Sequence, residues 1–175
     1  MIQSFVLDAK KILKIQARLG NLSKITIFIY ILLLVTTDFF IKHFALANLA
    51  PFETVYFLPF LNFYLTFNTG IAFSMFDFGA GLSSYILLFI GLLIVIFLTK
   101  QLLAETNRLS QTALVLIVGG ALGNILDRAG DGAVTDFLHF YINNFSFFIF
   151  NPADAFICIG AILLVGSEFL KTSNG

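Results

Sequence analysis

The chain has 175 residues and a formal net charge of zero; 59% of its residues are hydrophobic and 11% are charged. Soluble domains carry roughly a quarter charged residues, so this composition and a mean hydropathy of +0.97 exclude a soluble globular protein and predict an integral membrane protein. A neutral chain offers no basic surface to nucleic acid, and a single cysteine excludes an internal disulfide.

Residues 1–24 form a basic amphipathic arm in the sequence. Apolar residues recur there at three- and four-residue spacing, while Lys10, Lys11, Lys14 and Arg18 fall largely on other faces. This pattern predicts a helix that lies on the cytoplasmic leaflet and is attracted by anionic lipid. A solvated arm whose charge only sets the topology is the alternative, and the sequence leaves it open.

Residues 25–47 are the first predicted membrane span. Asp38 and Lys42 interrupt it four residues apart, so they are neighbours on one helical face. A helix rises about 1.5 Å per residue, which puts Asp38 roughly 20 Å beyond Ile25, in the half of the bilayer away from the arm. We expect an ion pair that supports packing; the alternative is a pair that braces an active layer.

Residues 48–81 contain no Lys or Arg and predict short strands or an extended loop at the membrane surface. Near its end, Gly70 permits a tight turn. Asn68 offers both a donor and an acceptor. It is therefore either a turn residue or a member of a polar site.

Three further spans are predicted at residues 82–98, 109–126 and 153–170, followed by a polar tail at 171–175. With the first span they make one membrane domain over 25–170. Gly119, Gly120 and Gly123 lie in the 109–126 span and allow close approach of neighbouring helices.

The basic residues predict the topology. Eight of the ten Lys and Arg residues lie before the first span, between the second and third, or after the fourth. By the positive-inside rule, both termini are cytoplasmic, and residues 48–81 and 127–152 face outward.

With that topology, polar side chains associated with all four spans meet in one layer at the outer membrane surface. They are Asp38, Lys42, Asn68, Asn124, Asp127, Arg128, Asp136, Asn151 and Asp154. Intramembrane ionisable groups are costly and usually serve function. We interpret Asp127 and Arg128, which are adjacent at a helix end, as a structural ion pair.

Asp136 and Asp154 are the candidate catalytic pair. No Ser, Cys or His has a partner at a spacing that suggests a nucleophile or a metal site, so we expect neither a metal nor another cofactor. Two carboxylates held close share one proton: the ionised one takes a proton from water, and the protonated one polarises a carbonyl. Each is followed by an apolar, helix-like stretch, and helix caps or anchors are the rival interpretation.

Five segments, in this order, resemble the motifs of the lipoprotein signal peptidase (signal peptidase II) family. They are residues 38–42, 68–74, 119–128, 132–137 and 150–154. The resemblance implies an aspartyl endopeptidase of the bacterial cytoplasmic (inner) membrane, which removes the signal peptide from diacylglyceryl-modified prolipoproteins just before the lipid-bearing Cys. There are departures: Phe39 stands where the family usually has Gln, and Thr135 where it has an apolar residue.

The resemblance also implies roles and a fold. Its catalytic positions fall on Asp136 and Asp154. Structural support or substrate contact is implied for Asp38, Lys42, Asn68, Asn124, Arg128 and Asn151, and we expect the same of Gly70 and Asp127. The implied fold is an all-α membrane protein of four transmembrane helices, with a small extracytoplasmic β-platform from residues 48–81 and a short surface helix before the fourth span. The partners would be a prolipoprotein with a diacylglyceryl-Cys and membrane lipid, and we expect a monomer.

Two other classes of protein remain as rivals. A proton-coupled membrane transporter also uses intramembrane carboxylates, but it needs polar groups in both halves of the bilayer or broken helices at mid-depth. A non-catalytic membrane subunit would tolerate neutralisation of Asp136 or Asp154.

Overall fold

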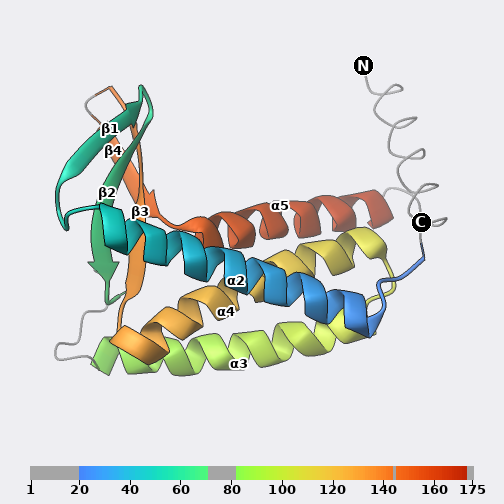
Figure 1. The fold of residues 1–175 in the computed structure, drawn as a ribbon. Coiled ribbons are helices and arrows are strands. Elements are labelled where there is room, and N and C mark those ends of the chain that lie inside the picture. Colours follow the sequence, from blue (N-terminus) through green and yellow to red (C-terminus); the bar gives the residue numbers. More distant parts are fainter. Residues whose placement is uncertain (1–19, 71–81, 144, 173–175) are drawn as a thin grey trace, which may run out of the picture.

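The structure, a computed structural model, describes residues 20–70, 82–143 and 145–172. Four helices run side by side, and a four-stranded sheet crosses one end of them (Figure 1). The helices are α2 (Lys24–Asn48), α3 (Leu82–Ala104), α4 (Arg108–Asp131) and α5 (Pro152–Thr172). The predicted N-terminal amphipathic helix lies mostly outside the described residues.

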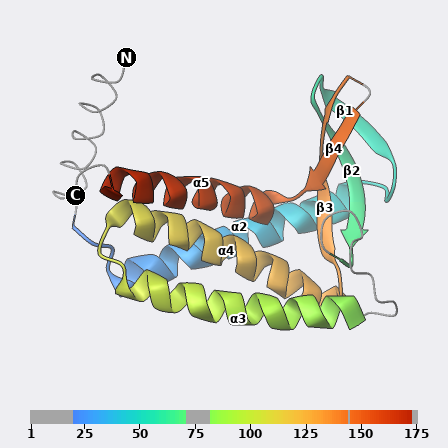
Figure 2. The ribbon, with the colours of Figure 1, turned by 180° about the vertical axis from the view of Figure 1, so that it is seen from behind.

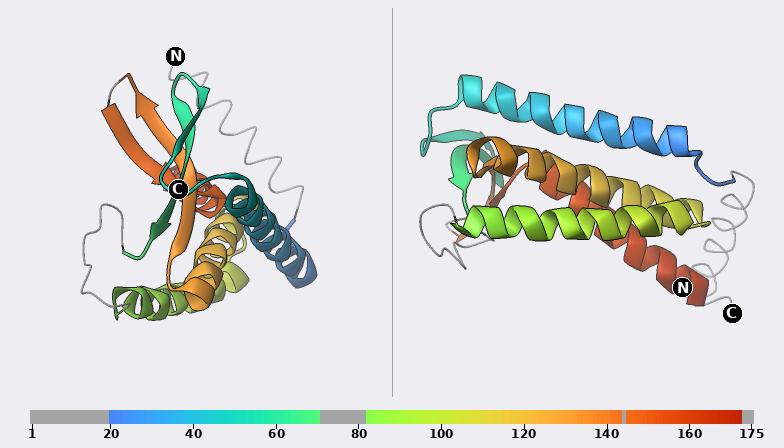
Figure 3. Two further views of the ribbon diagram at one scale, coloured as in Figure 1. Left: turned by 60° about the vertical axis from the view of Figure 1, so that its left-hand side comes forward. Right: turned by 90° about the horizontal axis from the view of Figure 1, so that it is seen from below.

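All four helices are long and apolar enough to cross a membrane. Helix α4 is the central one: it packs against each of the other three, and it is the most buried of the four (Figures 2 and 3). The others expose rows of large apolar side chains, as expected for surfaces that face lipid.

Two helices extend further than predicted. Helix α3 continues past residue 98 to Ala104, and α4 continues past residue 126 to Asp131. The predicted ends followed the first polar residues, but a helix keeps its backbone hydrogen bonds beyond the apolar stretch. Helix α4 ends where Gly132 adopts a left-handed conformation, with φ of 72°, that a side chain would strain.

The sheet is antiparallel, in the order β1 (Thr54–Leu58), β2 (Leu61–Asn68), β3 (Val134–Ile142) and β4 (Phe145–Phe150). Strands in residues 48–81 agree with the sequence prediction. The predicted surface helix before the fourth span is wrong, because the described residues between α4 and α5 hold the β3–β4 hairpin instead. The helix-like interpretation of the stretch that follows Asp136, residues 137–140, is wrong for the same reason: it belongs to β3.

The residues at the β3–β4 turn explain why the chain forms a hairpin there. Asn143 sits at the turn with φ of 53°, a left-handed conformation that Asn tolerates well. The flanking residues are β-branched and aromatic, which favour a pleated surface over a helix. Strand β2 pairs with β3 so that Thr66 lies opposite Asp136 and Asn68 opposite Val134.

Candidate active site

The nine polar residues predicted to meet do lie at one end of the bundle, where the sheet joins the helices. Asp38 and Lys42 come from the last turns of α2. Asn124, Asp127 and Arg128 come from the final turns of α4. Asp136 lies on β3, Asn68 ends β2, and Asn151 and Asp154 open α5. Gly70 follows shortly after Asn68. Residues far apart in sequence are thus placed together by helix length and strand pairing.

Lys42 is the cation at the base of this cluster. Its ammonium nitrogen lies 2.7 Å from Asp38 Oδ2 and 2.9 Å from Asp127 Oδ2, and it donates to Asn124 Oδ1 at 3.0 Å. Lys42 and Asp38 are almost fully buried. Asp38 also accepts a hydrogen bond from the backbone N–H of Ala153 at 2.9 Å, which fixes the start of α5 against α2.

The predicted ion pair between Asp127 and Arg128 is wrong. Asp127 pairs with Lys42 and accepts a hydrogen bond from the backbone N–H of Thr135 at 3.1 Å. Arg128 instead donates from Nη2 to the carbonyl oxygen of Gly70 at 3.2 Å. Adjacent helix residues point about 100° apart, so neighbours in sequence rarely face each other.

Asn151 links the two candidate catalytic carboxyls. Its side-chain nitrogen donates to Asp136 Oδ1 at 2.6 Å, and its backbone N–H donates to Asp154 Oδ2 at 3.2 Å. Its side-chain oxygen accepts from the backbone N–H of Asp154 at 3.0 Å. Asn151 and Asp154 therefore form a capping box at the start of α5, with Pro152 as the first helical residue.

Each carboxyl also has a second amide neighbour. Asn68 donates to Asp136 Oδ2 at 3.2 Å, and Asn124 donates to Asp154 Oδ1 at 2.8 Å. The rival interpretation of Asp154 as a helix-capping residue is geometrically correct, but it does not conflict with chemistry, because the cap uses Oδ2 and leaves Oδ1 on Asn124. The hydrogen bonds to both carboxyls thus come from amide groups, and neither carboxyl forms a direct ion pair among the described residues.

Burial raises the pKa of the Asp136 carboxyl from 3.8 to about 6, and the nearby charge of Asp154 adds to the rise. Hydrogen bonds from Asn151 and Asn68 and the charge of Lys42 oppose it. Asp136 is 3% exposed. At one site, therefore, a carboxyl with a raised pKa lies beside a second carboxyl.

We expect Asp136→Asn to stabilise the protein above pH 6. Because the folded pKa is raised, the stability that Asp136 confers is present below pH 3.8 and is lost as pH rises through about 6. The neutral amide avoids that loss, by an amount on the order of 3 kcal/mol at most. Thermal unfolding of both proteins from pH 4 to pH 8 measures it. Asp131→Asn, which removes an exposed carboxylate, is the matched control; equal gains at every pH would contradict the assignment.

Glycine lets α4 approach this cluster closely. A Cβ on Gly123 would lie 2.5 Å from Asp38 Oδ2, and one on Gly120 would collide with the carbonyl oxygen of Ala153. This agrees with the predicted close approach of the helices. Nothing lies within 4 Å of a Cβ on Gly130, in the same helix.

We expect Gly123→Ala to lower the free energy of unfolding by about 1–3 kcal/mol, because the added methyl displaces a buried, ion-paired carboxylate. Gly130→Ala should be neutral or stabilising by up to about 1 kcal/mol through helix propensity. Chemical denaturation in detergent micelles compares the two variants. Equal effects on the free energy of unfolding would show that contact with Asp38 is not the reason for glycine at position 123.

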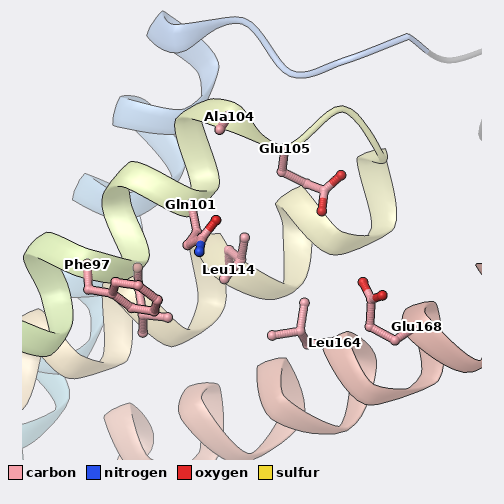
Figure 4. A pocket seen from close by; sticks show the side chains of 8 residues that line it. Phe97, Gln101, Ala104, Glu105, Leu114, Leu164 and Glu168 are labelled. Carbon is pink, nitrogen blue, oxygen red and sulfur yellow. The ribbon is translucent and has the colours of Figure 1, made fainter.

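A separate cavity of about 410 Å³ lies at the opposite end of the bundle, between α3, α4 and α5 (Figure 4). Glu105 and Glu168 line it, together with mostly apolar residues. Lys171 pairs with both carboxylates, at 3.2 and 2.7 Å. Lys171 therefore bridges the two carboxylates of this cavity.

The described residues include no group of three or more His, Cys, Asp or Glu side chains that could hold a metal ion. The sequence does not predict the two backbone donors of the site, from Ala153 and Thr135. No sequence signal identifies a backbone N–H as a ligand of a particular carboxylate, because that depends on where another helix or strand ends.

Comparison with known proteins finds one family and several similar proteins. The model of the Signal peptidase (SPase) II family matches residues 30–170. Lipoprotein signal peptidases of Yersinia pestis (strain Pestoides F) and Yersinia pseudotuberculosis serotype O:3 (strain YPIII) are each 40% identical over 139 residues, which are 78% of this chain and 82% of theirs.

Two solved structures are also similar. Both are bacterial membrane enzyme structures obtained by the in meso method, at 2.3 and 1.9 Å resolution, and both are 28% identical to this chain. Their TM-scores are 0.77 and 0.74. The similarity covers 89% and 85% of this chain, and 94% and 96% of the two others.

Proposed function

Because the chain belongs to the signal peptidase II family, we propose that it is an aspartyl endopeptidase that removes signal peptides from diacylglyceryl-modified prolipoproteins, cutting just before the lipid-bearing Cys. The family membership and the four apolar helices make it a peptidase and a multi-pass protein of the bacterial inner membrane. The aspartyl mechanism, the cleavage point and the residue roles are the proposal.

One observation carries the mechanism: Asn151 holds the carboxyls of Asp136 and Asp154 in a single hydrogen-bonded unit. The pair shares one proton, because two neighbouring carboxylates resist joint ionisation. The raised pKa of Asp136 supports placing the resting proton there. Asp154 is then the ionised partner.

The reaction follows from that distribution. Asp154 takes a proton from water, whose oxygen attacks the scissile carbonyl, while Asp136 gives its proton to the carbonyl oxygen. In the tetrahedral intermediate the proton balance is reversed: Asp154 donates to the leaving nitrogen, and Asp136 takes a proton back from a hydroxyl as the C–N bond breaks. The pair returns to its starting state without a metal or other cofactor.

The remaining polar residues have supporting roles in this proposal. Lys42 and Asp38 hold Asn124 and the start of α5, and these position Asp154. Arg128 and Asn68 border Gly70 and Asp136, where the backbone of an extended substrate would lie. Both termini would be cytoplasmic and the sheet end would face outward, as the distribution of basic residues indicates. We expect the enzyme to act as a monomer.

The transporter alternative has less support. Apart from Glu168 near the other end of α5, which pairs with Lys171, the acidic residues of the described helices lie at the sheet end, and the four spans run unbroken as single α-helices. A transporter of the inverted-repeat type uses broken helices at the bilayer midplane.

The test is cleavage of a purified substrate. The protein, reconstituted in lipid vesicles, is incubated with a diacylglyceryl-modified prolipoprotein, and mass spectrometry follows loss of the signal peptide. We expect a mature product that begins at the modified Cys, and much slower cleavage of the same precursor without the diacylglyceryl group. Equal rates on both precursors would refute the substrate assignment, and no cleavage of either would refute the peptidase mechanism.

A further inference from the structure

The sheet has one apolar and one polar face. Strand register fixes this division, because paired residues share a face and successive residues alternate. One face carries the pairs Val55–Phe63, Leu61–Phe140, Phe63–Leu138, Phe140–Phe148 and Ile142–Phe145. The other carries Tyr56–Asn62, Thr54–Tyr64, Asn62–His139 and Tyr141–Ser146, with a hydrogen bond between His139 and Ser146. Ile149, opposite His139, is an apolar exception on this face.

The apolar face is turned towards the helix ends. Phe63 and Leu138 pack against a buried cluster that includes Ala45 of α2, so this face closes the end of the bundle there. The strands run across the helix ends, and both hairpin tips extend beyond α5 (Figures 1 and 3). Past α5, none of the described helices lies beneath the same face (Figure 1).

The overhanging part exposes large apolar side chains, notably Phe57 (59% exposed), Phe145 (66%) and Phe148 (52%). Ring contacts connect Phe145 and Phe148 to the start of α5. Centroid distances of 4.7–5.5 Å link Phe145, Phe147, Phe140, Phe148 and Phe150 in a continuous row. Phe150 directly precedes Asn151 and the lipid-facing helix α5, so the apolar surface is continuous from the membrane span to the hairpin tip.

The charge pattern fits a lipid surface. Residues 54–68 and 137–150 contain no Asp, Glu, Lys or Arg. A soluble protein partner would normally meet a polar rim with some charge, and a water-exposed edge strand is normally protected by charge. An uncharged, Phe-rich face opposite a face of Tyr, His, Asn and Ser is the pattern of the membrane interface.

We propose that the overhanging sheet lies in the membrane interface beside α5, with the Phe145–Phe148 face inserted among the acyl chains and the Tyr56–His139 face in water. The hairpins then act as a lateral anchor that fixes the sheet at the depth of the helix ends. This inference goes beyond the peptidase reaction and holds for either orientation of the chain in the membrane.

The absence of Trp from the sequence makes the test direct, since a single introduced Trp is the only indole in the protein. Phe148→Trp probes the apolar face, Tyr56→Trp (80% exposed) probes the polar face, and Phe89→Trp (63% exposed, on α3) is a lipid-contact control. Each variant is reconstituted in phosphatidylcholine–phosphatidylglycerol vesicles with or without brominated acyl chains, which quench nearby indoles.

We expect blue-shifted emission and at least about twofold quenching for Phe148→Trp and Phe89→Trp, and little quenching for Tyr56→Trp. Water-like, unquenched emission of Phe148→Trp beside a quenched Phe89→Trp would overturn the proposal. Blue-shifted but unquenched emission would also overturn it, because a second copy or another protein would then cover the face. None of these readouts depends on cleavage, so this inference and the peptidase proposal fail separately.

Discussion

Asp136→Asn and Asp154→Asn should each reduce cleavage of a diacylglyceryl-modified prolipoprotein by at least about 10³-fold, with the fold retained. Each amide keeps the shape of the carboxyl, and its oxygen can still accept one of the two hydrogen bonds that the carboxyl accepts. It cannot exchange the proton that the reaction needs, and loss of a general acid or base typically costs about 10²–10⁴-fold. Single-turnover cleavage rates at saturating substrate, with circular dichroism as the folding check, measure this effect.

A double variant sharpens the result. Because the two carboxyls would act as one unit, Asp136→Asn/Asp154→Asn should be no slower than either single variant by more than a small factor. Asp131→Asn, at an exposed position on α4, is the control for a general charge effect. Near-normal turnover by either single variant would remove that residue from the proposed pair.

The same Asp136 variant should be more stable and less active. Burial beside Asp154 raises the pKa of Asp136 and makes its charged form costly at neutral pH. The neutral amide relieves that cost and removes the chemistry. A stabilising mutation that abolishes turnover would be the expected signature of a group held in an unfavourable state for function.

The helices and the polar layer are predictable because both leave a periodic or compositional trace in the sequence. Four long apolar stretches can only be helices or barrel strands in a membrane, and a spacing of four residues is enough to place Asp38 and Lys42 on one helical face. The helix ends are less predictable: Lys100 and Asp131 are polar, yet they lie inside helices because the backbone hydrogen bonds continue past the apolar core.

The sequence does not reveal the β3–β4 hairpin, because short apolar runs are ambiguous between helix and strand. The stretch Phe137–Phe140 has only four residues. Apolar Leu138 and Phe140 alternate with His139 and Tyr141, but this alternation indicates a strand only when β2 is known to pair with it. The partner of Asp127 escapes prediction for a related reason. Its cation, Lys42, lies far earlier in the chain, and only the packing of α2 on α4 brings them to 2.9 Å.

Among single changes to the polar residues at the sheet end, Lys42→Met should lower the free energy of unfolding the most. It leaves Asp38 and Asp127 without their cation, and Asp38 is 1% exposed, so water cannot replace the lost ion pair. Removing one partner from a buried ion pair typically costs about 3–5 kcal/mol. Asn124 also loses its Lys42 contact, so the position of Asp154 should loosen and cleavage should fall too.

The chain contains a matched control for this change. Lys171 also lies between two carboxylates, Glu105 and Glu168, but its side chain is 35% exposed. Lys171→Met should therefore cost only about 0–1 kcal/mol. Chemical denaturation in micelles compares the two variants, and Lys42→Met/Asp38→Asn should recover part of the loss, since it removes a charge that Lys42→Met leaves buried. Equal costs at the two lysines, or no recovery in the double variant, would show that burial of the Asp38–Lys42 pair does not control stability at the sheet end.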